Sequence, residues 1–368
     1  RKNLANIRSG EYEGFDQKIK DPNWKPDYGP AVFNASAGTT AIGARDFLVA
    51  YNVNLNTTSV RRANSVAFDV RENGRVKREG DPINGKIVRD SDGNAERVPG
   101  LLKSVKAIGW FIEEYGVAQI SMNLTDIKVC SLHRAFEAVR ECSNKRGLRV
   151  TGSELVGLVP KKVMIDAGKY FLTQQKRSTG ISEQEIIRLA IKSLGLDELG
   201  AFDPRKKIIE YLLEDEGDKN LVNKNLTSFA DETASESPAP GGGSIAAYVG
   251  ALGVSLGTMV ANLSAIKKGW DDKWEYFSDV AADGQKIKDE LLFLVDEDTN
   301  AFNKIIEAIR LPKATDEEKA TRKQAITAAT KFAIDIPLRV MTTAHSSYAL
   351  LKLMAEKGNP ASVSDAGV

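Results

Sequence analysis

The period of the apolar residues changes near Asn225, and this change limits what the 368-residue chain can fold into. Before it, short alternating runs rich in β-branched residues are mixed with runs of helical spacing. After it, apolar residues recur only at helical spacing. A period of two indicates strands and a period near 3.6 indicates helices. The sequence therefore predicts an α+β region followed by an all-α helical bundle.

Within the α+β region, the order of the runs is strand, helix, strand, strand, helix, strand, which is typical of a ferredoxin-like (βαββαβ) fold. A polar stretch, 75–98, interrupts this order and is expected to be an exposed hairpin or loop. We expect strands at 47–55, 104–113, 118–129 and 149–159, and helices at 60–70, 131–143, 161–172, 182–193 and 203–213. Ser182 and Glu185 have the spacing of a capping box.

The domain organisation follows from the same patterns. Residues 1–42 are rich in Gly, Pro, Asn and Asp, which is typical of a linker or a binding loop. The acidic run Glu214–Asp218 indicates a boundary. We therefore divide the chain into 1–42, an α+β domain at 43–213, a linker at 214–225 and a helical domain at 226–368. Helices are expected at 226–232, 244–266, 283–309, 315–335 and 337–356.

Composition excludes several classes of protein. Lys and Arg number 51 against 50 Asp and Glu, so the net charge of +1 gives no reason to expect a nucleic-acid partner. Two Cys and two His cannot form a disulfide framework or a zinc cluster, and we expect no metal. The chain starts at Arg1 without Met, and the sequence predicts the start of a helix near Ser364, so we expect a fragment truncated at both ends.

The segment 245–266 carries no charged side chain. Its length would suffice to cross a bilayer, which takes about 20 apolar residues. Ser255, Asn262 and the small residues Gly253 and Gly257 favour the alternative, a helix buried in a bundle or at a subunit interface. We therefore expect no membrane span.

A Gly-rich loop, Ala239-Pro-Gly-Gly-Gly-Ser244, precedes this apolar helix. Glycines allow a backbone to approach a ligand closely, and the free N–H groups of a helix start favour anions. The loop is not a Walker loop, because no Gly-Lys-Ser/Thr follows. A ligand loop and a flexible hinge both remain open from the residues alone.

Asp298 is the candidate for acid–base chemistry. It lies on an otherwise apolar helical seam, where a carboxylate is costly unless it is paired or functional. Burial raises the pKa of a carboxyl group, which suits a general acid–base. The alternative is a structural Asp that caps a neighbouring helix or pairs with Lys. Asp296, on a more polar face, is the weaker candidate, and His133 and His345 are expected to pack or cap. The seam is Leu291, Val295, Asp298, Phe302, Ile305 and Ile309.

Several stretches together resemble one family. They are Gly43–Leu55 (GARDFLVAYNVNL), Gly152–Pro160 (GSELVGLVP), Arg205–Leu212 (RKKIIEYL), Ala239–Ser244 and Leu311–Lys313. In this order they resemble the formiminotransferase-cyclodeaminase family, bifunctional folate enzymes of histidine breakdown. The resemblance covers nearly the whole chain.

The resemblance implies a role for each segment. Residues 1–42 resemble the end of the first transferase subdomain, 43–213 the second, and 226–368 a C-terminally truncated cyclodeaminase domain. The family's cyclodeaminase Asp best matches Asp298, with Asp296 as the alternative. The family's folate-binding stretch implies as ligand contacts Trp24, Pro26, Asp27, Gly29, Pro30, Phe33 and Gly38. Arg8, Lys267, Lys268 and Lys313 are further candidates for the glutamate tail of the folate.

The implied activity is transfer of a formimino group from N-formimino-L-glutamate to a polyglutamylated tetrahydrofolate. Closure to 5,10-methenyltetrahydrofolate then releases ammonia. The resemblance also implies a cytoplasmic homo-oligomer. The family's transferase His lies in the first subdomain, and neither His133 nor His345 matches it. We therefore expect this chain to lack transferase activity and to have weak or no deaminase activity. The alternative is a non-catalytic folate-binding or assembly protein built from the same domains.

Overall fold

The computed structural model describes residues 7–44, 46–81, 84–213 and 221–368, and the acidic run expected as a linker lies largely outside them. The chain forms two compact units, residues 1–47 and 48–368, which are described separately. In the smaller unit, the ring of Phe33 packs against those of Tyr12 and Phe15, with centroids 5.4 and 5.9 Å away. Its regular elements include α2 (Phe15–Lys18) and the 3₁₀ turn η1 (Pro22–Trp24).

An antiparallel sheet organises the first half of the larger unit. Its strand order is β4-β5-β1-β6, so β1 has hydrogen-bonded partners on both sides. The strands are β1 (Val49–Leu55), β4 (Val105–Ile112), β5 (Val117–Leu124) and β6 (Val150–Val156). Arg75–Val76 (β2) and Arg97–Val98 (β3) pair as a separate hairpin, which confirms the expectation for 75–98. An antiparallel α+β domain therefore precedes the helices, as predicted.

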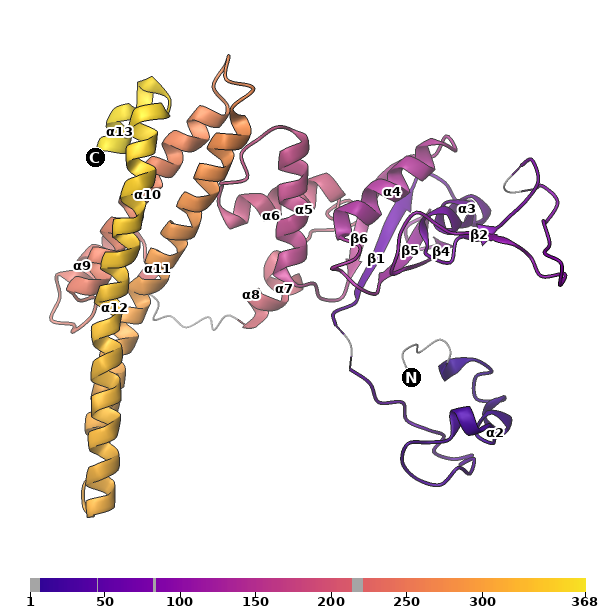
Figure 1. The fold of residues 1–368 in the computed structure, drawn as a ribbon, viewed down its shortest axis with the longest axis horizontal. Coiled ribbons are helices and arrows are strands. Elements are labelled where there is room, and N and C mark those ends of the chain that lie inside the picture. The colour runs from indigo at the N-terminus through magenta and orange to yellow at the C-terminus, as the bar shows by residue number, and fades with distance from the viewer. Residues whose placement is uncertain (1–6, 45, 82–83, 214–220) are drawn as a thin grey trace. The chain divides into compact units, whose positions relative to one another are not determined.

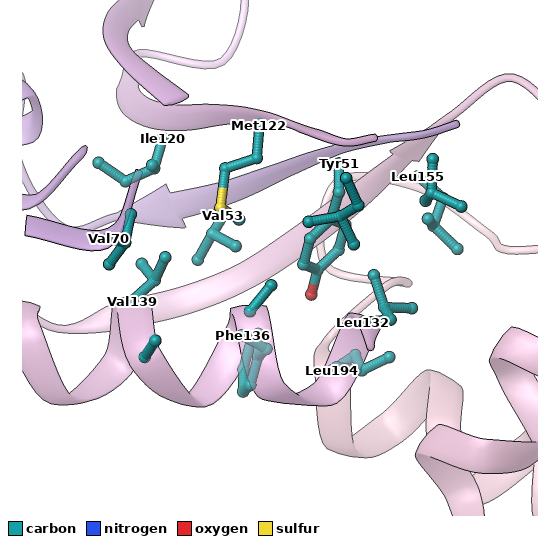
Figure 2. Packing of buried hydrophobic residues seen from close by; sticks show 14 of the residues in the cluster. Tyr51, Val53, Val70, Ile120, Met122, Leu132, Phe136, Val139, Leu155 and Leu194 are labelled. Carbon is teal, nitrogen blue, oxygen red and sulfur yellow. The ribbon is translucent and has the colours of Figure 1, made fainter. Parts of the chain in front are cut away.

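One face of the sheet packs on α3 (Val60–Val70) and α4 (Leu132–Asn144). Tyr51 and Val53 of β1 point toward Phe136 and Val139 of α4 (Figure 2). Tyr51 is fully buried, and its hydroxyl donates to Ser153 Oγ at 2.9 Å. Burial raises the pKa of Tyr51 well above its ordinary value, so the phenol stays neutral and can donate.

The opposite face of the sheet carries a buried polar network. Asn54 lies directly across from Gln119 in the sheet, and Gln119 Nε2 donates to Asn54 Oδ1 at 2.8 Å. Trp110 Nε1 donates to Gln119 Oε1 at 3.2 Å, and Asn54 donates to Glu198. Both amide side chains are fully buried, and their hydrogen bonds offset the cost of removing them from water.

Two expected elements of the α+β domain differ in the structure. The strand expected at 118–129 ends at Leu124, because the Asp126 carboxylate accepts from the Lys128 N–H and turns the chain. The helix expected at 203–213 is divided at Ile208, which is extended, buried and paired with Val159. The helices here are α5 (Lys161–Gln174), α6 (Glu183–Leu194), α7 (Pro204–Lys207) and α8 (Ile209–Leu213).

The second half of the larger unit is helical, as predicted. Figure 1 shows α10, α11 and α12 side by side, and all three pairs are in contact. Of the described helices, α10 alone is long and apolar enough to cross a membrane, yet many of its residues are buried against α11 and α12. The helices are α9 (Leu226–Thr233), α10 (Gly242–Ala265), α11 (Trp274–Arg310), α12 (Asp316–Lys357) and α13 (Val363–Gly367).

The expected helix boundaries were wrong in α11 and α12. The former begins at Trp274 rather than Asp283, because Phe277 and Ala281 are buried and extend the packed face. The two helices expected at 315–335 and 337–356 are one, with Pro337 inside. A proline within a helix costs about 3 kcal/mol. Ile336 and Val340, on either side of it, are both in the bundle core, and this packing holds the helix together.

The turn between α5 and α6 rests on the helical bundle. Asn262 Nδ2 of α10 and Gln285 Nε2 of α11 both donate to the Gly180 carbonyl, at 2.8 and 3.2 Å. Ser278 Oγ accepts from the Thr179 N–H at 2.9 Å. A Cβ at Gly180 would lie 2.3 Å from the Ala281 carbonyl carbon. Only glycine therefore allows this approach.

We predict that Gly180→Ala destabilises the chain by about 1–3 kcal/mol, the usual cost of overpacking a tight contact. The added methyl would meet the backbone of α11, which cannot move without moving the helix. Thermal unfolding of the chain measures the change. Gly200→Ala is the control, because a Cβ there has nothing within 4 Å. Equal melting temperatures for the two variants would contradict the prediction.

Candidate active site

The first turn of α10 is capped by a side chain from α11. Asp298 Oδ2 accepts from the Ser244 N–H at 2.9 Å and from Ser244 Oγ at 3.1 Å. The residue at the N-cap position, Gly241, supplies no side-chain cap of its own. Carboxylates are stabilised at helix N-termini, where N–H groups lack partners within the helix. The structure thus brings together the Gly-rich loop and the seam carboxylate, which were separate candidates in the sequence.

Glycine is required where the loop meets this carboxylate. A Cβ on Gly243 would lie 2.2 Å from Asp298 Oδ1 and 2.6 Å from its Cγ. A Cβ on Gly241 would lie 3.5 Å from Asp298 Oδ2, an ordinary contact. The close approach is therefore specific to position 243, which accounts for one glycine of the three in the motif.

A cavity of about 280 Å³ opens beside the carboxylate. Asp298 is the one ionisable residue among the described residues that line it. Thr299 also lines it, and its hydroxyl is buried without a hydrogen-bond partner in the described chain. The other lining residues are small or apolar: Pro238, Ala239, Gly241, Gly242, Gly243, Ala301, Phe302, Ile305 and Ala333. A single carboxylate in such a wall can accept or donate one proton.

Asp296 faces a different part of the structure. Its Oδ1 accepts from the Leu221 N–H at 2.7 Å, and it does not line the cavity. Burial raises the pKa of Asp296, while hydrogen bonds from the Leu221 and Val222 backbone oppose the rise. The Asp296 carboxylate therefore binds the backbone of the turn before α9, whereas the Asp298 carboxylate lines the cavity. The structure thus distinguishes the two Asp candidates.

The apolar seam of α11 is buried over only half its length. Leu291 and Val295 are fully buried, but Phe302 and Ile309 are 43% and 46% exposed. The helices α10 and α11 are antiparallel, since Gly250 approaches Leu291 and Ser244 binds Asp298. Residues of α11 beyond Asp298 therefore extend past the start of α10. The expectation that the whole seam is buried was wrong.

The folate-binding candidates all lie in the smaller unit. Phe33 is half-buried against Tyr12, and the ring of Trp24 lies under Lys18 Nζ, 4.0 Å from its centroid. Gly29 and Gly38 have positive φ angles of 83° and 63°. Pro26 and Gly38 are half-buried, whereas Asp27, Gly29 and Pro30 are exposed. These positions stay predictions.

Of the tail candidates, Lys267 Nζ lies 4.1 Å from the Trp270 ring centroid.

Both histidines pack against aromatic rings. His133 stacks on Tyr170 with centroids 4.4 Å apart, and its Nε2 lies 2.9 Å from Ser131 Oγ. Burial lowers the pKa of His133, which favours the neutral ring. His345 meets Tyr348 edge-on at 5.8 Å. Neither residue lines the cavity beside Asp298.

Sequence reasoning missed two residues of the site. Ser244 was part of the Gly-rich motif, but nothing in the sequence indicated that it would bind Asp298, 54 positions away. Thr299 follows Asp298 directly and carried no signal at all. The pairing depends on the register of α10 against α11, which only the structure gives.

The fold and the site together define a multidomain protein. An antiparallel α+β domain is followed by a helical domain with a small cavity that is lined by one carboxylate and mostly apolar residues. Three family models match consecutive parts of the chain. They are described as "Formiminotransferase domain, N-terminal subdomain" (1–45), "Formiminotransferase domain" (50–214) and "Formiminotransferase-cyclodeaminase" (225–368). The chain therefore belongs to the formiminotransferase-cyclodeaminase family of enzymes.

Relatives resemble either the whole chain or one half. Formimidoyltransferase-cyclodeaminase from Gallus gallus is 39% identical over 368 residues, 99% of this chain and 64% of the relative. Glutamate formimidoyltransferase from Streptococcus pyogenes serotype M1 is 38% identical, over 47% of this chain and 49% of the relative. Methenyltetrahydrofolate cyclohydrolase from Methylorubrum extorquens is 38% identical, over 40% and 70%. The chain thus spans 64% of the length of the Gallus gallus relative, which matches 99% of this chain.

We predict that Asp296→Asn stabilises the chain relative to the parent more at pH 7 than at pH 3. The raised pKa means that the folded chain binds this proton more tightly than the unfolded chain. Stability from this group is present at low pH and is lost as pH rises from the ordinary carboxyl range through the raised pKa. Asparagine cannot ionise and avoids that loss.

Melting temperatures of both proteins at the two pH values test this. Asp283→Asn, an exposed position on the same helix, is the matched control. A difference between parent and Asp296→Asn that is the same at pH 3 and pH 7 would contradict the prediction.

Proposed function

We propose that this chain is part of a bifunctional folate enzyme of histidine degradation. The enzyme would transfer a formimino group from N-formimino-L-glutamate to tetrahydrofolate and then close 5-formiminotetrahydrofolate to 5,10-methenyltetrahydrofolate. The names of the relatives that match the α+β half and the full length support the two steps. The observation that carries the second step is the Asp298 carboxylate, held by Ser244 at the wall of a small cavity.

Cyclisation needs one group that first accepts a proton and then donates it. N10 of the folate attacks the carbon of the protonated formimino group (–CH=NH₂⁺) and gives up its proton, which leaves a neutral amino group on that carbon. This amino nitrogen takes one proton, its bond to the carbon breaks, and it leaves as ammonia while the carbon becomes the methenyl carbon of the product. A carboxylate can accept the first proton and return it in the second step. We assign both roles to Asp298 and keep Asp296 as the alternative that the experiment below decides.

The cavity's size and lining agree with this role. About 280 Å³ lies just below the usual range for sites that hold a whole ligand. It can therefore take only the reacting part of a folate. The walls are small and apolar apart from Asp298 and Thr299, so Asp298 is the one ionisable group that the described lining offers to a substrate.

Several finer assignments belong to the same proposal. The order β1, α3, β4, β5, α4, β6 supports a ferredoxin-like α+β domain. We retain domain boundaries at 1–42, 43–213, 214–225 and 226–368, and assign folate binding to the segment 24–38. The substrate is a polyglutamylated tetrahydrofolate, with no metal. Ile334, Leu338 and Met341 form an exposed apolar stripe on α12, which supports a homo-oligomer. We place the enzyme in the cytoplasm.

A second candidate function concerns the helical domain alone. A protein named methenyltetrahydrofolate cyclohydrolase is similar to 40% of this chain, over 146 residues, and this supports the candidate. A cyclohydrolase would add water to the methenyl carbon and open the ring that the cyclodeaminase closes. Ammonia release from 5-formiminotetrahydrofolate distinguishes the two, because ring opening by water releases none.

We predict that Asp298→Asn abolishes cyclisation in the longest natural polypeptide that contains this sequence. The amide keeps the shape of the side chain but cannot accept a proton from N10. Single-turnover release of ammonia from 5-formiminotetrahydrofolate measures the step, and folate binding is measured in parallel. We expect a loss of at least about 100-fold, in the range of general acid–base catalysis.

Matched variants make the result specific. Glu297→Gln, next to Asp298 on the same helix but not part of the cavity wall, should keep full turnover. Loss of turnover in Asp296→Asn but not in Asp298→Asn would move the role to Asp296. Unchanged turnover in both Asp variants with intact folate binding would favour the non-catalytic folate-binding alternative.

The 368-residue chain should also show no formimino transfer to tetrahydrofolate. Its two histidines are packed against aromatic rings, and neither matches the family's transferase His. An assay with N-formimino-L-glutamate and tetrahydrofolate tests this directly, with a full-length relative as the positive control. Detectable transfer by this chain would contradict the prediction that neither of its histidines is the transferase His.

A further inference from the structure

Ser244 treats the two oxygens of Asp298 differently. Both hydrogen bonds from Ser244, from its backbone N–H and from its hydroxyl, go to Oδ2. In the described chain, Oδ1 receives no hydrogen bond and lies against the Cα of Gly243. We propose that Ser244 is a positioning residue that anchors Oδ2, so that Oδ1 is the oxygen that exchanges protons with the substrate. This inference rests on the function proposed for Asp298.

The anchor is rigid. Ser244 is fully buried and lies in the first turn of α10, so the helix fixes the direction of its N–H. The hydroxyl is therefore the one part of the anchor that a substitution can remove while the backbone hydrogen bond remains. Gly243 completes the arrangement, because any side chain there would occupy the position of Oδ1.

Few other charges act on this carboxylate. The helix α10 contains no Asp, Glu, Lys, Arg or His, and neither does the loop 237–241. On α11, Asp296 binds the Leu221 N–H, Glu297 accepts from Asn300 at 3.0 Å, and Lys304 Nζ lies 4.0 Å from the Phe332 ring centroid. The contribution of α12 to the cavity wall is Ala333. The Ser244 hydroxyl is thus the side chain that the structure shows hydrogen-bonded to Asp298.

Removal of the hydroxyl should therefore affect catalysis in a recognisable way. A hydroxyl that donates to one carboxylate oxygen helps to fix the direction of the other, and catalysis is sensitive to small errors in that direction. In Ser244→Ala we expect kcat to fall about tenfold, as is usual when a supporting hydrogen bond to a functional group is lost. KM should stay within about twofold, because Ser244 does not line the cavity.

Two further variants separate positioning from a merely structural role. Ser264→Ala removes another fully buried hydroxyl of α10, which donates to Val260 O at 2.7 Å and lies far along the helix from the cavity. It should lower the melting temperature without changing kcat. Ser244→Thr restores a hydroxyl and should return kcat toward its parental value, even if the added methyl lowers the melting temperature.

The assays use the longest natural polypeptide that carries this sequence. A parental kcat in Ser244→Ala overturns the proposal. Equal losses of kcat in Ser244→Ala and Ser264→Ala also overturn it, because they would show a general effect of loosening α10. A loss of kcat with unchanged KM in Ser244→Ala alone, with rescue by Ser244→Thr, supports it.

A spectroscopic measurement distinguishes failure of this inference from failure of the proposed function. The ¹³C carboxyl resonance of Asp298, assigned by its absence in Asp298→Asn, can be recorded in the 368-residue chain at one pH without any turnover. A resonance that moves in Ser244→Ala but not in Ser264→Ala, while Asp298→Asn remains active, would keep the anchor and reject the catalytic role. An unmoved resonance with an inactive Asp298→Asn would reject the anchor alone.

Discussion

The helical half depends on the close approach of α10 to its two neighbours. Small residues make that approach possible: a Cβ on Gly284 would lie 2.1 Å from Thr258 Oγ1, and one on Gly257 would lie 2.7 Å from a Leu351 methyl. Dispersion contacts grow as two surfaces approach, so this packing supplies many weak contacts rather than a few strong ones. The register set by these contacts places the start of α10 at Asp298.

The same register explains why the site has so few polar groups. The helix α10 has no charged side chain, so the N–H groups of its first turn take a partner from another element. The neighbouring helix α11 provides the Asp298 carboxylate as that partner. Beyond that point α11 continues without α10 beside it, which leaves room for a cavity lined by Phe302 and Ile305. The cavity thus lies where α11 extends past the start of α10, beside the Gly-rich loop.

Much of this architecture could be predicted from the sequence because it depends on local patterns. Alternation along Val49–Leu55 and helical spacing in Val60–Val70 reflect burial on one face, and both elements are present. The errors arose where distant residues decide. Val159 extends Ile208 out of a helix, and the bundle core keeps α12 continuous through Pro337. Asp298 could be selected because its neighbours on the seam are apolar, but its partner could not, since no local pattern encodes the register of two helices.

The contact between Ser244 and Asp298 also has an evolutionary consequence. The hydrogen bonds that begin α10 are the ones that hold the carboxylate in place, so folding uses Oδ2 of Asp298 and the proposed reactivity uses Oδ1 of the same carboxylate. Sequence changes that strengthen the cap would also restrain the acid, and changes that free the acid would fray the helix. Substitutions of Ser244 or Asp298 are therefore constrained both by the stability of α10 and by the proposed reaction. Changes in the apolar residues of the cavity wall could alter the reaction with less effect on the helix.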